Sequence, residues 1–324
     1  MKKSWLRKRI AASVLVLFVV LVLNFVLFRI MPGDVVSTII DPNFSPESKA
    51  RLRELYGLDK PILEQFFIYI RQMLTFRFGL SFLSQRPVWE ELLSRLPLTL
   101  VLMSASMLLS AILGIWLGIK AALNRGKFAE KLVLRSSAIT TAFPSFFVQL
   151  VLLMLFARAF PIFPLRGSLS VPPPVGNWKL FCDYAHHLAL PVLSLTIMGF
   201  GGWALYVRNL MVRVLKEDYI LMAEARGLSE KRVIYGHAFR TILPPIFTIL
   251  LMSLPGLVSG AVITESVFSL HGVGTFLVEA VSGNDYPAAG AAFYLLALIT
   301  VLCNLLADIM YGVVDPRVRL EEQN

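Results

Sequence analysis

The feature that most limits the fold of this chain is a series of apolar stretches, each about 18 to 25 residues long, the length that a helix needs to cross a bilayer. No water is available inside the hydrocarbon core, so each stretch must satisfy its own backbone N–H and C=O groups. The stretches lack the apolar–polar alternation of membrane β-strands. The sequence therefore predicts an all-α integral membrane protein with six transmembrane helices, at about residues 10–28, 97–120, 136–160, 187–208, 243–267 and 288–312.

The charge of the chain fits this class. Charged residues make up 16% of the sequence, whereas soluble globular proteins carry about a quarter. The formal net charge of +10 could indicate nucleic-acid binding, but membrane proteins concentrate Lys and Arg in cytoplasmic loops. We favour that second interpretation and expect no nucleic acid partner. Cys182 and Cys303 lie in a polar loop and an apolar stretch, so neither a disulfide nor a metal site is indicated.

The first apolar stretch follows a basic N-terminus and could be read as a signal peptide. A signal peptide has an apolar core of about 7 to 15 residues and a cleavage site of small residues. Here the stretch runs to Phe28 and is followed by Arg29, Ile30, Met31 and Pro32, which offer no such site. We therefore expect the stretch to remain as the first span, with its basic end in the cytoplasm.

The loops set the predicted orientation. Basic residues are concentrated in the connections at 124–135 and 208–240, whereas residues 269–287 contain no Lys or Arg. Because positive loops face the cytoplasm, the sequence predicts a multi-pass protein of the cell inner membrane with both termini in the cytoplasm.

The chain divides into three parts on this reading. Residues 1–30 form the cytoplasmic N-terminus and first span, residues 31–96 an external loop with short amphipathic helices, and residues 97–324 a five-helix core. One external helix is expected to begin after Ser45 and to end near Gly57. A second is expected to begin at Pro61 and to lie along the membrane surface.

The cytoplasmic loop at about 209–242 has the pattern of two short helices joined by a bend. Asp218 can cap the first helix, and Gly227 can end it in a left-handed conformation. Ser229 can cap the second helix, which would run towards Pro244 and Pro245 at the start of the next span.

The first of these helices carries small residues. Ala223 and Ala225 would let a partner protein approach the helix backbone closely. A solvated connector without a partner is the other interpretation that these residues allow.

This loop resembles the coupling loop of binding-protein-dependent ABC importer permeases, in particular their dipeptide, oligopeptide and nickel branch. Strings typical of that branch recur in order along almost the whole chain, and their joint spacing carries the resemblance. The strings are MPGD at 31–34, YGLDKP at 56–61, RPV at 86–88, LPLTL at 96–100, DY at 218–219, AEARGLS at 223–229, HAFR at 237–240, PP at 244–245, ESVF at 265–268, GVG at 272–274, DYP at 285–287 and DPRVR at 315–319.

The resemblance implies the type I importer architecture and a set of partners. These partners are a homologous second permease subunit, two ATP-binding subunits, an external solute-binding protein and the lipid membrane. ATP and Mg²⁺ would be bound by the ATP-binding subunits, and this chain would hold no cofactor, metal or catalytic residue. Consistently, the sequence contains no Gly-x-x-x-x-Gly-Lys-[Ser/Thr] string.

The resemblance also assigns residues to coupling with the ATPase. They are Ala223, Glu224, Ala225, Arg226, Gly227 and Leu228. The wider pattern has a glutamate six residues before the glycine, where this chain has Leu221, so Glu224 does not inherit that glutamate's role.

Other residues are candidates on the external side and within the spans. Gly272, Gly274, Asp285 and Tyr286 are expected on the side of the binding protein, where the two glycines would form a tight re-entrant turn. Glu265 and Asp308 are ionisable residues near membrane depth, where charged groups are costly and often functional. They are either gates or substrate contacts, or else hydrogen-bonded supports of helix packing, and we favour helix packing.

Two other classes compete with the importer. An ion-coupled secondary transporter would need a relay of buried acids or repeated broken helices. A membrane-embedded hydrolase would need a nucleophile and base within the spans, and His186 and His187 lie at a span edge. We favour an importer of dipeptides or oligopeptides, with nickel chelates or oligosaccharides as alternative substrates.

Overall fold

The computed structural model describes residues 3–30 and 60–314. Its described residues form helices joined by turns and loops, with one isolated bridge between Leu80 and Pro87 as their only strand-like pairing. The helix expected between Ser45 and Gly57, and the strings at 31–34 and 315–319, lie outside these residues. The helices are α1 (Lys3–Ile30), α3 (Ile62–Leu74), α4 (Val88–Leu123), α5 (Phe128–Ala142), α6 (Ser145–Leu153), η1 (Met154–Ala159), α7 (Asn177–Val214), α8 (Asp218–Ala225), η2 (Arg232–Ala238), α9 (Phe239–Phe268), α10 (Val273–Ser282) and α11 (Tyr286–Val314).

Five helical segments in the described part of the chain are long and apolar enough to cross a membrane. They lie in α1, α4, α7, η2 with α9, and α11. Two bent helix pairs raise the possible number of spans to seven. The first pair, α5 with α6 and η1, covers the third predicted span and bends by 101°. Counting this pair as one broken span, and the second pair as re-entrant, gives the six crossings that the sequence predicts.

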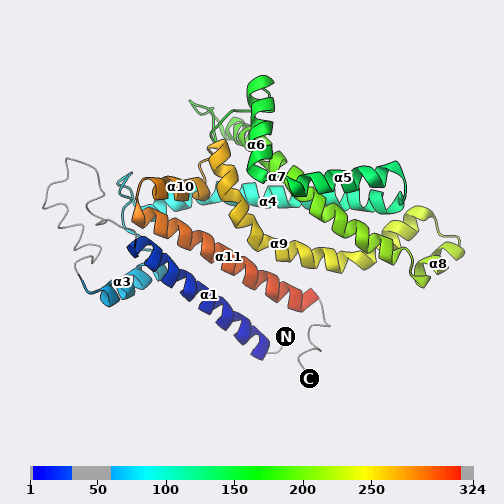
Figure 1. Cartoon of the computed structure of the whole chain (residues 1–324), viewed down its shortest axis with the longest axis horizontal. Helices are drawn as coiled ribbons and strands as arrows, with labels where there is room; N and C mark the ends of the chain where they lie inside the picture. Colours follow the sequence, from blue (N-terminus) through cyan, green and yellow to red (C-terminus); the bar gives the residue numbers. More distant parts are fainter. Residues whose placement is uncertain (1–2, 31–59, 315–324) are drawn as a thin grey trace.

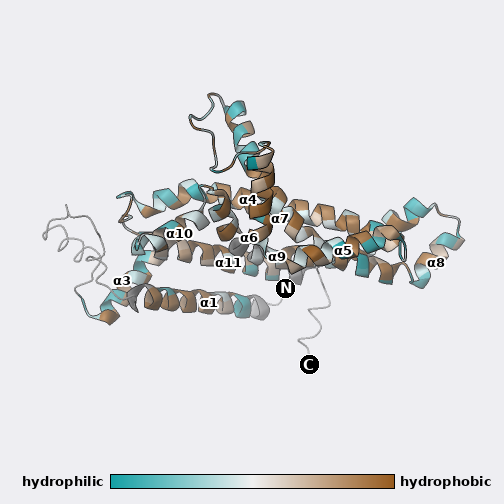
Figure 2. Ribbon diagram, turned by 45° about the horizontal axis from the view of Figure 1, so that its top comes forward, coloured by the Kyte–Doolittle hydropathy of each residue, from teal (hydrophilic) through white to brown (hydrophobic). Residues whose placement is uncertain are grey.

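The long helices lie along the long axis of the molecule, with α8 at one end and α3 and α10 towards the other (Figure 1). Hydrophobic residues dominate the long helices, and hydrophilic residues gather around α8 and in the segment that precedes α7 (Figure 2). This is the distribution expected of a bundle whose middle faces lipid and whose ends face water.

The pair α4 and α7 is held together by small residues. A side-chain Cβ on Gly118 would lie 2.7 Å from the carbonyl oxygen of Ala204, and one on Gly114 would overlap Trp203. Glycines spaced by four residues let two membrane helices approach closely. Gly114 and Gly118 therefore allow α4 and α7 to pack closely.

Helix α1 packs antiparallel to α11. Asn24 is fully buried on α1, and its amide nitrogen donates a hydrogen bond to the carbonyl of Gly290 at 3.0 Å. At the other end Arg9 and Asp308 form an ion pair at 3.3 Å. These two contacts place residue 3 and residue 314 towards the same end of the bundle.

Two helix boundaries differ from the sequence prediction. α4 begins at Val88, nine residues before the expected start of the span, and Pro97 lies inside it. Pro244 and Pro245 were expected to open the fifth span, but η2 and α9 run through them without a break. Ile242 and Ile246 are buried on either side of these prolines, and such packing lets a membrane helix tolerate proline.

The surface helix begins after Pro61, as predicted. Its Phe66 and Tyr69 pack against Phe25 of α1, with ring centroids 5.2 and 5.5 Å apart. The opposite side exposes Leu63 and Phe67, so α3 keeps an apolar face available to lipid.

Candidate functional site

The bend between α8 and η2 is built around Gly227. This residue has φ +74°, the left-handed conformation that the sequence predicts and that favours glycine. The N–H of Gly227 donates to the carbonyl of Glu224 at 2.8 Å, and the N–H of Leu228 donates to that of Ala223 at 3.4 Å. This pair of bonds is a Schellman motif, and it ends α8 with a fixed change of direction.

The start of α8 differs by one residue from the prediction. Glu217 is the cap residue and Asp218 is the first residue of the helix, without a side-chain capping bond. Asp218 still places a negative charge in the first turn, where it interacts favourably with the helix dipole. After the bend the next helical residue is Glu230, so Ser229 precedes the second helix as predicted.

One side of α8 is buried in the chain itself. Ile220 is fully buried and Ala223 is 6% exposed, and both pack in a cluster with Val207, Met211 and Val233. From the sequence, Ala223 was expected to let a partner protein approach the helix backbone closely. Instead its small side chain lets α8 pack closely against the rest of this chain.

The opposite side of α8 is the exposed one. Leu221 is 54% exposed and Met222 58% exposed, and Ala225 lies next to them because residues four apart share a helix face. Glu224, Arg226 and Gly227 are also exposed, whereas Leu228 is half-buried. Leu221 and Met222 were not among the predicted coupling residues; their apolar character on a short cytoplasmic helix was the available signal.

One hydrogen bond joins α8 to α9, and a second group of contacts joins α5 to α7, against which α8 packs. The Tyr219 hydroxyl donates to the Thr241 hydroxyl of α9 at 3.0 Å. Nearby, Nε of Arg208 on α7 donates to Oε1 of Glu130 on α5 at 2.9 Å, and the N–H of Gly126 donates to Oε2 at 2.6 Å. Glu130 is the only acid among the basic residues between 124 and 135, and this isolated acid is the sequence signal for the pair.

A second candidate region lies where α9 turns into α10. Ser269 has a left-handed conformation at the end of α9, and the two helices meet at 77°. The chain thus turns sharply just before residues 272–274, where the sequence predicts a tight turn.

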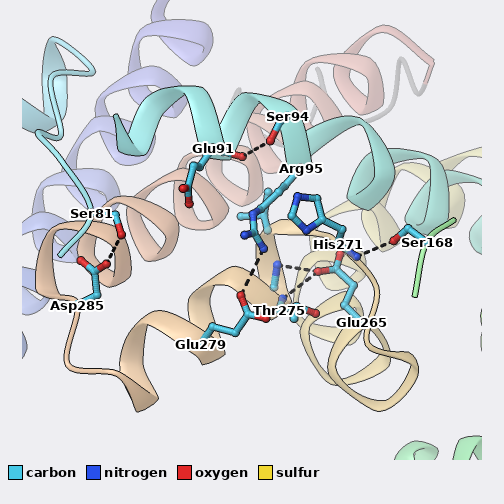
Figure 3. Close-up of polar contacts among 12 residues, drawn as sticks. Ser81, Glu91, Ser94, Arg95, Ser168, Glu265, His271, Thr275, Glu279 and Asp285 are labelled. Carbon is cyan, nitrogen blue, oxygen red and sulfur yellow. Dashed lines mark hydrogen bonds and ion pairs between the residues drawn. The ribbon is translucent and has the colours of Figure 1, made fainter. Parts of the chain in front are cut away.

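Glu265 is fully buried inside this turn (Figure 3). Its carboxylate accepts hydrogen bonds from the hydroxyl of Thr99 at 2.7 Å and from the N–H groups of Gly274 and Thr275 at 2.7 and 3.1 Å. The Thr99 hydroxyl in turn accepts from the N–H of Val273 at 3.0 Å. Glu265 and Thr99 thus cap α10 from two other helices, an arrangement suited to helix packing.

The two glycines of the turn are buried around this carboxylate. A Cβ on Gly272 would overlap the carboxylate of Glu265, and one on Gly274 would lie 2.6 Å from Cα of Val262. Both glycines were expected on the side of the binding protein. Their burial shows that they serve the close packing of α9 and α10.

Asp285 is also buried, at 1% exposure. Its carboxylate accepts hydrogen bonds from the hydroxyl of Ser81 and the N–H of Leu83, and from the N–H of Ala288 at 3.2 Å. Asp285 therefore caps α11 and fixes the loop before α4, while its neighbour Tyr286 is half-buried. Ser81 and Leu83 are contacts that the sequence did not identify.

Arg95 lies beside the Glu265 cap. Its guanidinium lies 4.5 Å from the ring centroid of Phe276 and 3.4 Å from the carboxylate of Glu279. Figure 3 shows Arg95 reaching from α4 towards α10, with His271 nearby. The N–H of His271 donates to the hydroxyl of Ser168 at 2.6 Å, which ties the turn to the loop that precedes α7.

The structure does not bring Glu265 and Asp308 together. Glu265 lies at the turn between α9 and α10, whereas Asp308 pairs with Arg9 at the opposite end of the bundle. Within residues 3–30 and 60–314, no three His, Cys, Asp or Glu side chains gather in a way that could hold a metal ion. Nε2 of His186 lies 2.8 Å from the carbonyl oxygen of Ile162, and Nδ1 of His187 lies 2.9 Å from that of Asp183.

Comparison with known families gives two matches that together cover nearly the whole chain. Residues 96–320 match the family described as binding-protein-dependent transport system inner membrane component. Residues 1–103 match the N-terminal family of the same transport system membrane components.

Individual relatives are similar over almost their full length. The di/tripeptide transport system permease protein DppB of Pseudomonas aeruginosa is 34% identical, with 98% of each chain covered. The oligopeptide transport system permease protein AppB of Bacillus subtilis is 32% identical, covering 97% of this chain and 99% of its own. The dipeptide transport system permease protein DppB of Escherichia coli is 33% identical, with 92% and 93% covered.

Proposed function

This chain belongs to the binding-protein-dependent transport system inner membrane components, the membrane subunits of ABC importers, and we propose that the solute it carries is a short peptide. The single observation that supports peptide is the set of relatives, which are named as dipeptide, di/tripeptide or oligopeptide permeases over nearly their full length. The chain is thus a multi-pass inner membrane protein and a transport component.

The proposal places α8 on an ATP-binding subunit. Leu221, Met222 and Ala225 form a small exposed apolar face on a helix whose other side is anchored in the chain. Exposed apolar patches bordered by polar residues mark protein–protein contacts. The rigid bend at Gly227 lets α8 transmit movement of the ATP-binding subunit to α7 and α9.

The remaining partners follow from the same proposal. A homologous second permease completes the pore, two ATP-binding subunits bind and hydrolyse ATP with Mg²⁺, and an external binding protein delivers the peptide. This chain itself supplies no catalytic group and binds no cofactor. Both termini lie in the cytoplasm, consistent with the antiparallel packing of α1 on α11.

Uptake by a reconstituted complex tests the proposed solute. The chain is co-expressed with its partner subunits, placed in proteoliposomes with the binding protein outside, and supplied with ATP inside. We expect accumulation of labelled Ala–Ala that depends on ATP and on the binding protein. Accumulation of a nickel chelate or an oligosaccharide, with none of peptide, would contradict the peptide assignment. Uptake that follows an ion gradient without ATP would contradict the importer mechanism.

A further inference from the structure

A cavity of about 190 Å³ lies between α4, α7 and α9. α4 contributes Ser106, Met107 and Ser110, α7 contributes Trp203, and α9 contributes Ser253 and Gly256. The α4 and α9 residues lie near the middle of their helices, and Leu195 and Gly199, which also line the cavity, lie near the middle of α7. If the helices cross the bilayer, the cavity therefore lies close to the centre of the membrane.

The polar groups of the cavity are hydroxyls. Ser106 and Ser253 donate their protons to carbonyls of their own helices, each at 2.6 Å, which leaves oxygen lone pairs available as acceptors. The side-chain hydroxyl of Ser110 has no hydrogen bond to any described residue, so it can both donate and accept.

The lining residues carry no formal charge. An unpaired charge buried in such surroundings would be costly, so the cavity suits an uncharged group. Met107 and Trp203 offer apolar and aromatic surface, and the three hydroxyls can bond an amide N–H and C=O. An amide with an apolar side chain combines these properties.

The volume limits how much of a solute the cavity can hold. Pockets for drug-sized ligands start at about 300 Å³, and this cavity is smaller. It can therefore receive part of a solute, while the charged ends of that solute lie elsewhere.

We propose that this cavity is a transient binding site for the uncharged part of a peptide as it crosses the membrane, with its main-chain amide on Ser106, Ser110 and Ser253. The proposal rests on the proposed function, because it names where that solute binds. It assigns Met107 and Trp203 to the apolar side chain of the peptide.

Two glycines of the bundle allow a matched test. A Cβ on Gly256 or on Gly202 would meet no atom within 4 Å, so a larger residue at either position starts without a clash. Gly256 lines the cavity, whereas Gly202 is exposed on α7 and does not. Gly256→Phe should fill the cavity, and Gly202→Phe should leave it open.

The experiment measures uptake of labelled Ala–Ala by the complete complex in proteoliposomes, together with subunit assembly and ATP hydrolysis. We expect Gly256→Phe to assemble and hydrolyse ATP but to lose about tenfold or more of its uptake, while Gly202→Phe transports normally. Normal uptake by Gly256→Phe would overturn the proposal. If the unmodified complex takes up another solute and no peptide, the proposed function fails instead.

A labelling measurement decides the matter if Gly256→Phe does not assemble. Ser110→Cys is made together with Cys182→Ser and Cys303→Ser, so that the described part of the chain contains a single thiol. A water-soluble thiol reagent should react at position 110 in the working complex, and Ala–Ala with the binding protein should slow that reaction. Absence of reaction, or a rate unaffected by the peptide, would overturn the proposal.

Discussion

The hydroxyl of Thr99 and the carboxylate of Glu265 lie 2.7 Å apart and together accept the first three N–H groups of α10. Thr99 comes from α4 and Glu265 from α9, so this contact joins α4, α9 and α10. Glu265 is completely buried, and a buried donor that loses its acceptor is costly. The contact therefore predicts a structural role for Glu265.

Removal of this carboxylate should destabilise the protein. Glu265→Ala leaves the Thr99 hydroxyl and two N–H groups of α10 without their acceptor, which should lower the free energy of unfolding by about 1–3 kcal/mol. Thermal unfolding of the purified complex in detergent measures the change. Asp308→Ala serves as the comparison, since its half-exposed ion pair with Arg9 should contribute less than about 1 kcal/mol. A larger effect from Asp308→Ala would contradict this assignment.

Gly272 should tolerate no side chain. Gly272→Ala places a methyl group on the Glu265 carboxylate, and overpacking of this kind costs about 1–3 kcal/mol. Gly202→Ala adds the same methyl group where there is open space and should leave the melting temperature nearly unchanged. Equal melting temperatures for the two variants would show that the turn relaxes without cost.

Gly227 should be replaceable only by a residue that accepts the left-handed conformation. Asn adopts that conformation more readily than other residues, whereas a β-branched residue is strained there. Gly227→Val should therefore hydrolyse ATP with little peptide uptake, and Gly227→Asn should retain most of both. A Cβ at this position meets no atom within 4 Å, so a difference between the two variants reports backbone conformation. Normal uptake by Gly227→Val would contradict a coupling role for the bend.

The Arg208–Glu130 pair should behave as one unit. The carboxylate of Glu130 accepts hydrogen bonds from the guanidinium of Arg208 and from the N–H of Gly126. A substitution of Glu130 or of Arg208 therefore leaves the other member of the ion pair without its charged partner. In a double-mutant cycle, Glu130→Gln with Arg208→Met should be less destabilised than the sum of the two single variants. If the decrease in melting temperature of the double variant equalled the sum of the decreases in the two single variants, the two residues would act independently.

The sequence predicted the helical class, the spans and the bend because each depends on local pattern. Apolar length defines a membrane helix, and a glycine after a short helix indicates a left-handed end. The broken third span and the passage of α9 through Pro244 and Pro245 were not predicted. Both depend on packing against other helices, which a single sequence does not show.

The sequence identified where the candidate site residues lie along the chain, but it did not predict which side chains they contact. Gly272, Gly274 and Asp285 were predicted to lie on the side of the binding protein, but the sequence did not show that Glu265, Val262 and Ser81 pack around them. Ala223 and Leu221 lie two residues apart, yet one is buried and the other exposed. Helix rotation decides such differences, and it follows from tertiary packing.

The most direct test of the account is whether the exposed face of α8 holds an ATP-binding subunit. The tagged chain is purified with its partners in mild detergent, and bound subunits and ATP hydrolysis are measured. Leu221→Lys with Met222→Lys should lose the ATP-binding subunit while keeping the second permease. Leu83 is similarly exposed, and its N–H donates a hydrogen bond to Asp285, at the other end of the chain's helix bundle from α8 (Figure 1). Leu83→Lys should therefore keep both the ATP-binding subunit and the second permease. If the α8 variant still co-purified with as much ATP-binding subunit as the unmodified chain, α8 would not be the contact with that subunit.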